Sequence, residues 1–226
     1  MLPKPRLFQR ITKLALMLLT VVALIPGNAL DLNRLQLAFR ALGGNQGAFN
    51  EWNLLMQTPA DESIEMRLQK VNDFFNRKLI YFEDQEIWGV PDYWATPMES
   101  LSKGKADCED YVIAKYFALR NLNIPDSQLR LIYVKARIGG PSSKIQQAHM
   151  VLAYYPPGNA EPQVLDNLIS EIRPASKRPD LSPIFSFNSQ GVFAGTAATA
   201  TLGTGGTSRL SRWQDLLERA RREGFD

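Results

Sequence analysis

A long helix is predicted to begin within Lys105-Ala106-Asp107-Cys108-Glu109-Asp110-Tyr111. Asp107 is a good N-cap residue, and Asp110 three positions later makes a capping-box-like pair with it. The helix continues with one apolar side until Ile124-Pro125 stops it. This places Cys108, the single cysteine of the chain, in the first turn of a helix.

Helical patterns precede this stretch and strand patterns follow it. Residues 31–57 look helical but are interrupted by glycines, and a further helix is expected from Thr58-Pro59 to about Lys78. Thr96-Pro97-Met98-Glu99 is a capping box that opens a short helix. Strand patterns cover residues 128–137, 147–155 and 163–168. Helices followed by strands indicate an α+β fold with an antiparallel sheet.

The first 29 residues have the character of a secretory signal peptide. Four basic residues precede an apolar run from Leu14 to Ile25, and small residues follow as far as Ala29. The run is shorter than the ~20 apolar residues that a membrane-spanning helix needs. We therefore expect residues 1–29 to direct export, with an uncleaved membrane anchor as the alternative.

The charge of the chain depends on this segment. Residues 1–29 carry four basic and no acidic side chains, so the net charge of +3 becomes −1 when they are removed. The basic character of the whole chain therefore gives no reason to expect a nucleic-acid partner. What remains suits one domain with a proper core, which we assign to residues 30–193.

The last part of the chain, residues 194–226, changes in character. Ala194 to Thr207 is almost wholly alanine, glycine and threonine, which is typical of a flexible linker. Ser211-Arg212-Trp213-Gln214 is a second capping box, and it opens a basic amphipathic helix. We expect this helix to dock on the domain, although it could instead meet a partner.

His149 is the single histidine of the chain and lies in the strand pattern 147–155. A cysteine at a helix N-terminus that faces a histidine on a strand is the core of a thiol-enzyme site. The turn sequence Pro156-Pro157-Gly158-Asn159 leads to the next strand. If this turn is tight, Asp166 lies directly opposite His149. Cys108, His149 and Asp166 are thus candidates for nucleophile, general base and orienting carboxylate.

Three carboxylates surround the cysteine, those of Asp107, Glu109 and Asp110. Like charge opposes the thiolate and raises a thiol pKa. Either the helix dipole and capping bonds neutralise these groups, or a cation lies among them. Clustered carboxylates suit Ca²⁺, which takes about 6–8 oxygen ligands. From the residues alone, capping is the favoured explanation and a metal the alternative.

Four segments together carry a resemblance to a known family: Trp94-Ala95-Thr96-Pro97-Met98-Glu99, Asp107-Cys108-Glu109-Asp110-Tyr111, Ala148-His149-Met150-Val151-Leu152 and Val164-Leu165-Asp166-Asn167. The chain resembles the bacterial transglutaminase-like cysteine proteinases over about residues 50–190. Within that family it is most similar to the periplasmic proteases that release giant adhesins from the cell surface. The resemblance implies a papain-like, transglutaminase-like core, with N-terminal helices packed on an antiparallel sheet and Cys108, His149 and Asp166 as the triad.

The resemblance also implies a cofactor and partners. It implies a calcium-dependent enzyme whose acidic residues beside the cysteine bind the metal, and it carries that role to Asp107, Glu109 and Asp110, so that calcium becomes the favoured explanation. It implies a periplasmic endopeptidase that cleaves a large surface adhesin near its N-terminus at a paired-alanine site. An inner-membrane cyclic di-GMP receptor is the implied inhibitor. Release of the adhesin would promote biofilm dispersal.

Two alternatives fit the same residues. A transglutaminase or amidase could use the same triad, because the difference lies in which nucleophile reaches the acyl-enzyme. A binding module without activity is the other alternative, since a buried thiol, a core histidine and a turn-capping aspartate are each common by themselves.

Overall fold

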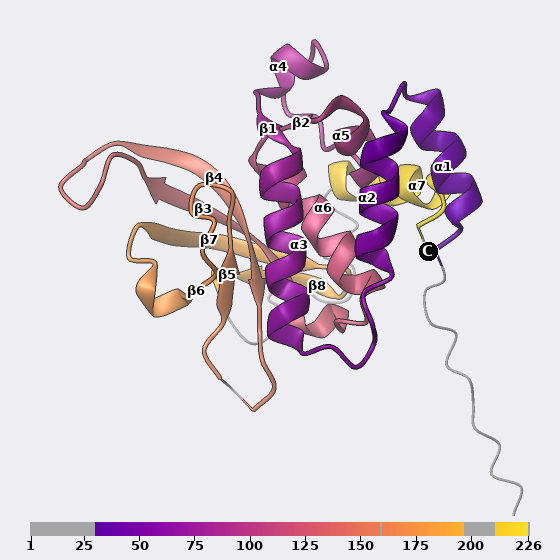
Figure 1. The fold of residues 1–226 in the computed structure, drawn as a ribbon. Coiled ribbons are helices and arrows are strands. Elements are labelled where there is room, and N and C mark those ends of the chain that lie inside the picture. The colour runs from indigo at the N-terminus through magenta and orange to yellow at the C-terminus, as the bar shows by residue number, and fades with distance from the viewer. Residues whose placement is uncertain (1–29, 159, 197–210, 226) are drawn as a thin grey trace, which may run out of the picture.

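The computed structural model describes residues 30–158, 160–196 and 211–225 (Figure 1). The predicted signal peptide and most of the predicted linker therefore lie outside the described residues. Among the described residues, none of the helices is long and apolar enough to span a membrane.

The helices and strands follow one another in a helix-rich first half and a strand-rich second half. The helices are α1 (Leu32–Ala41), α2 (Gln46–Met56), α3 (Ile64–Lys78), α4 (Asp84–Ile87), α5 (Pro97–Lys103), α6 (Cys108–Asn121) and α7 (Ser211–Glu223). The strands are β1 (Ile80–Tyr81), β2 (Lys105–Ala106), β3 (Leu129–Arg137), β4 (Gln146–Tyr154), β5 (Gln163–Leu165), β6 (Arg173–Pro174), β7 (Leu181–Asn188) and β8 (Gly191–Ala194). Short 3-10 turns cover Asp126–Gln128 and Ala175–Lys177.

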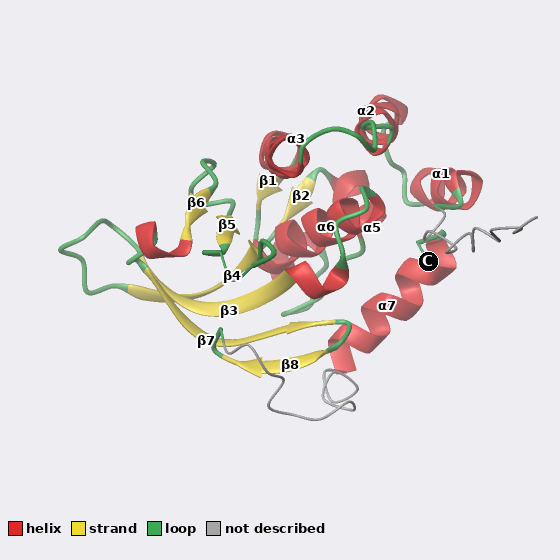
Figure 2. Ribbon diagram, turned by 90° about the horizontal axis from the view of Figure 1, so that it is seen from below, coloured by secondary structure: helices red, strands yellow, loops and turns green. Residues whose placement is uncertain are grey.

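Six strands form one sheet in the order β6-β5-β4-β3-β7-β8, and every neighbouring pair is antiparallel. Figure 2 shows α3, α5 and α6 gathered on one side of this sheet, while α7 runs past the end of β7 and β8. The predicted α+β class with helices packed on an antiparallel sheet is confirmed. Strands β7 and β8 were not expected from the sequence.

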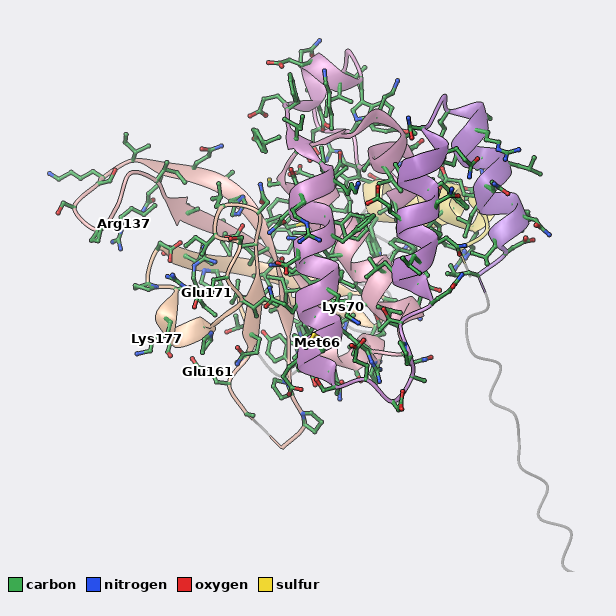
Figure 3. The ribbon with its side chains drawn as sticks, in the orientation of Figure 1. Met66, Lys70, Arg137, Glu161, Glu171 and Lys177 are labelled. Carbon is green, nitrogen blue, oxygen red and sulfur yellow. The ribbon has the colours of Figure 1, made fainter. Side chains whose placement is uncertain are left out.

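Helix α6 lies at the centre of the domain, between α3 and the sheet (Figure 2). Every residue from Asp110 to Leu119 is buried, so this helix has no solvent-facing side over that range. Its neighbour α3 is amphipathic instead. Val71 and Phe75 are fully buried, while Met66 and Lys70 lie on its exposed side (Figure 3).

Local capping chemistry explains where the helices begin. The Thr96 and Glu99 capping box forms as predicted at the start of α5, and Gly104 ends that helix in the left-handed conformation at φ 63°. The predicted start of α3 is wrong. Ser63 caps that helix through the N–H of Met66, and the chain at Thr58 is still outside it.

Strands β4 and β5 pair in a different register from the one expected. Leu152 lies opposite Leu165 and Ala153 opposite Val164, so the direct opposition of His149 and Asp166 is wrong. The physical reason is the connection, which runs from residue 155 to 162 and is not a tight two-residue turn. The slip amounts to two residues. Because side chains alternate along a strand, such a slip leaves both residues on the same face.

Helix α7 docks on the domain through its apolar side. Trp213 and Leu216 are fully buried, and Phe225, just beyond the helix, is only 1% exposed. The Trp213 ring contacts Tyr116 at 5.5 Å between centroids, and the Phe225 ring contacts Phe117 at 5.2 Å. The C-terminal helix thus completes the burial of α6.

Candidate active site

A pocket opens between the N-terminus of α6 and the first half of β4. Cys108 and His149 both line it, together with Glu109 and Tyr133. The single cysteine and the single histidine of the chain are thus brought to one cavity from two elements.

The first turn of α6 positions the cysteine. The Asp107 side chain caps the helix by accepting from the N–H of Asp110 at 3.2 Å, and Cys108 is the first helical residue. The thiol itself donates to Oε2 of Glu109 at 2.7 Å. Burial and the negative charge of Glu109 raise the pKa of the Cys108 thiol well above its ordinary value.

The histidine belongs to a buried hydrogen-bonded group that also contains Asp166 and Arg178. His149 is 5% exposed, and its Nε2 lies 2.8 Å from Oδ1 of Asp166. Nη2 of Arg178 donates to Oδ2 of the same carboxylate at 2.7 Å and also reaches Asp180 at 2.7 Å. Burial alone would raise the pKa of Asp166, but the hydrogen bonds and charges of His149 and Arg178 outweigh it and lower that pKa to about 2. Asp166 is therefore ionised, and Nδ1 of His149 is the ring nitrogen that it leaves open.

Three aspartates form an acidic cluster beside the thiol. Carboxylate oxygens of Asp84, Asp107 and Asp110 all lie within 4.8 Å of one another, and all three residues are buried. Burial and the neighbouring carboxylates raise the pKa of Asp107 to about 10, and burial raises that of Asp84 to about 6. Burial likewise raises the pKa of Asp110 well above its ordinary value.

The cluster has the donor set of a cation site. Oδ1 of Asp84 and Oδ2 of Asp110 are buried and accept no hydrogen bond within the described structure. Buried carboxylate oxygens without a donor are costly, and a hard divalent cation such as Ca²⁺ takes that kind of oxygen. Asp84, Asp107 and Asp110 therefore fit a calcium ion.

The predicted site residues are only partly brought together. His149 and Asp166 are in contact, Cys108 lies in the same pocket, and Asp107 and Asp110 belong to the acidic cluster. Glu109 is outside the cluster's oxygen set, because its carboxylate faces the thiol.

Two residues of the site were missed by sequence reasoning. Asp84 comes from α4, in a connection where nothing in the pattern linked it to α6. Arg178 follows a 3-10 turn after β6, and no motif marks it. Only the folding of distant segments brings these two charges to the site.

A helix that begins at a cysteine, packed on an antiparallel sheet that brings a histidine–aspartate pair to the same region, has the parts of a thiol-enzyme site: a nucleophile at a helix N-terminus and an oriented base. The family model described as bacterial transglutaminase-like cysteine proteinase matches residues 51–179. The chain belongs to this family and is accordingly a cysteine proteinase.

Solved structures of one relative share the fold. Legionella pneumophila LapG is 33% identical, with a TM-score of 0.69 over 85% of this chain and 98% of that one. EGTA-treated LapG is 34% identical, with a TM-score of 0.71 over 85% and 98%. Calcium-bound LapG is 36% identical, with a TM-score of 0.68 over 83% and 98%. A search among curated proteins gave no match.

Proposed function

We propose that this protein is a calcium-dependent periplasmic cysteine endopeptidase whose catalytic triad is Cys108, His149 and Asp166. The observation that carries the proposal is the 2.8 Å contact between His149 and Asp166 beside a pocket that His149 shares with the single cysteine. Membership of a cysteine proteinase family supports the reaction class.

The geometry supports a separate catalytic role for each of the three residues. Asp166 accepts a hydrogen bond from the protonated Nε2 of His149 and remains ionised, so Nδ1 is the base that takes the thiol proton. The Cys108 sulfur then attacks the carbonyl carbon of the scissile peptide, and the C–N bond breaks as His149 returns the proton to the leaving amine. Water resolves the acyl-enzyme with His149 again as base, which yields two fragments and the free thiol.

The first turn of α6 contributes to this step in two ways. The backbone N–H of Cys108 lies among the unpaired donors of a helix N-terminus, and it is our candidate for binding the oxyanion. The helix dipole favours the thiolate there. Glu109 opposes it, because the thiol donates to its carboxylate.

Calcium fits the site for an electrostatic reason. Asp84, Asp107 and Asp110 would hold the ion, and Glu109 remains a candidate ligand from the sequence. A bound divalent cation would offset the negative charge of the carboxylates beside the thiol. The solved structures of LapG in calcium-bound and EGTA-treated forms support the choice of this metal.

The substrate, the regulator and the compartment rest on the family resemblance and on residues 1–29. We propose that the substrate is the N-terminal region of a large surface adhesin, cut at a paired-alanine site so that the adhesin is released and the biofilm disperses. An inner-membrane cyclic di-GMP receptor is the proposed inhibitor. The basic and apolar pattern of residues 1–29 supports export to the periplasm.

The direct test is cleavage of purified N-terminal adhesin fragments. Wild type with calcium should give two fragments, and Cys108→Ala, His149→Ala or a chelator should each abolish them. Gln146→Ala, an exposed position of β4 that does not line the pocket, is the matched control and should retain activity. Cleavage by Cys108→Ala would refute the triad, and full cleavage in chelator would refute the metal.

Two further readouts separate the alternatives. Adding a labelled primary amine distinguishes the proteinase from a transglutaminase, which would give an amine-labelled product and no second fragment. Iodoacetamide should label Cys108 rapidly in the native protein and more slowly in His149→Ala. Resistance of the native thiol to alkylation in the presence of calcium would indicate a binding module without activity.

A further inference from the structure

The segment from Asp92 to Thr96 lies between the acidic cluster and helix α7. On the side of the cluster, the N–H of Tyr93 donates to Oδ2 of Asp84 at 2.5 Å. The N–H of Ala95 donates to Oδ1 of Asp110 at 2.7 Å. The segment thus orients two of the three carboxylates through its own backbone.

The opposite side of the same segment is held by α7. Nη2 of Arg219 donates to the carbonyl oxygen of Trp94 at 2.5 Å, and its Nη1 donates to Glu99 at 2.5 Å. Nε of Arg212 donates to the carbonyl oxygen of Asp92 at 3.1 Å. The Arg219 guanidinium also lies over the Tyr93 ring, 4.7 Å from its centroid.

These bonds fall on shared peptide groups. The carbonyl of Trp94 and the N–H of Ala95 belong to one planar peptide unit, so that unit joins Arg219 to Asp110. The carbonyl of Asp92 and the N–H of Tyr93 likewise form one unit. A donor on the carbonyl side of an amide fixes its plane and strengthens the N–H on the other side.

We propose that α7 is a positioning element of the cation site, and that Arg219 and Arg212 act on Asp110 and Asp84 through these two peptide units. The inference rests on the proposed calcium site. It adds to that site helix α7, which contributes none of the three aspartates of the acidic cluster. Arg219 is the stronger of the two, because its side chain is 16% exposed and that of Arg212 is 56% exposed.

The direction of the change in calcium affinity distinguishes a positioning role of Arg219 from a purely electrostatic one. Removing a positive charge near a cation site would by electrostatics alone tighten cation binding. Loss of a positioning contact weakens it, and outer-shell partners of metal ligands are typically worth about 10–100-fold in affinity. We therefore expect Arg219→Met to weaken calcium binding about tenfold.

The experiment is calorimetric titration of the purified full chain with calcium chloride. Arg219→Met should raise the dissociation constant about tenfold, and Arg212→Met should raise it by a smaller factor of about three. Arg222→Met is the matched control, since it removes the same charge from the same helix at a side chain that is 66% exposed. It should leave the dissociation constant within about twofold of wild type.

A second measurement uses the reciprocity of coupled sites. If α7 positions the cation site, calcium must in turn stabilise the docking of α7, and amide exchange in residues 211–223 should slow when calcium is added. Arg219→Met should abolish this slowing, and Arg222→Met should keep it. Neither readout depends on proteolytic activity.

The outcomes separate the two proposals. If wild type binds no calcium, the calcium site itself is wrong and the role of α7 with it. If wild type binds calcium and Arg219→Met binds it equally well or more tightly, the site stands and the positioning role is refuted. Should Arg219→Met fail to fold, the exposed Arg212→Met decides: unchanged affinity together with unchanged exchange of α7 would overturn the inference.

Discussion

Replacing Arg178 by methionine should lower the free energy of unfolding by about 3–5 kcal/mol at pH 7. The Arg178 guanidinium is 2.7 Å from Asp166, and the two side chains are 1% and 0% exposed. Methionine retains much of the apolar stem but has no charge. The substitution therefore leaves a buried carboxylate without its cation, and breaking a buried pair in this way is far more costly than losing a surface pair.

The pH dependence of the free energy of unfolding gives a second magnitude, the contribution of the lowered pKa of Asp166. The pKa of Asp166 is lowered from 3.8 to about 2, which is worth about 2 kcal/mol. Because the unfolded chain takes up this proton at a higher pH than the folded protein, the stabilisation is fully present above about pH 4 and is lost as the pH falls toward about 2. In Arg178→Met the folded-state pKa moves back upward, so this acid-induced loss should become smaller.

The assay is urea unfolding followed by tryptophan fluorescence, at pH 7 and at several lower values. Arg173→Met is the matched control, because Arg173 pairs at 2.7 Å with Glu171 but both side chains are exposed, by 41% and 68%. That variant should change stability by less than about 1 kcal/mol. Equal losses in the two variants, or an unchanged acid dependence in Arg178→Met, would refute the reasoning.

Three further outcomes are expected. Asp84→Asn should reduce the calcium-induced rise in melting temperature, because it removes one carboxylate charge from the cluster, and differential scanning fluorimetry with and without chelator measures this. Lys115→Met should stabilise the protein at pH 7, because burial lowers the pKa of this fully buried lysine to about 7. The free energy of unfolding of the wild type should therefore rise with pH between about 7 and 10.5. Chemical unfolding repeated across this range should show that the rise vanishes in the variant. Gly104→Ala should cost about 1 kcal/mol in thermal unfolding, since the backbone there has φ 63° and an added Cβ meets no atom within 4 Å, so that only the conformation is penalised.

The parts of the site that depend on local chemistry could be predicted from the sequence. The N-cap of α6 and the capping box of α5 are decided by side chains within four residues of one another, and both form as expected. The contact between His149 and Asp166 was predicted through a wrong register. It survives because the register differs by two residues, and an even slip preserves the face of the sheet.

The parts that depend on distant segments could not be predicted. Asp84, Arg178 and the arginines of α7 reach the site only after the chain has folded, and none of them stands in a local pattern with α6. Glu109 shows the converse. Its position beside the cysteine predicted a metal ligand, and that role stays a prediction; in the structure its carboxylate faces the thiol, whereas Asp107 and Asp110 cluster with Asp84.

The complete burial of α6 has a consequence for the synthesis of the protein. A helix that is buried around its whole circumference depends on its neighbours for stability, and in a partly folded chain its apolar residues would be open to aggregation. Its cover comes from α3 before it and from β3 and β4 after it, and the rings of Trp213 and Phe225 close over Tyr116 and Phe117 last in chain order. A nascent or truncated chain that lacks residues 211–225 would leave the rings of Tyr116 and Phe117 without this cover, so we expect such a chain to aggregate or to bind a chaperone.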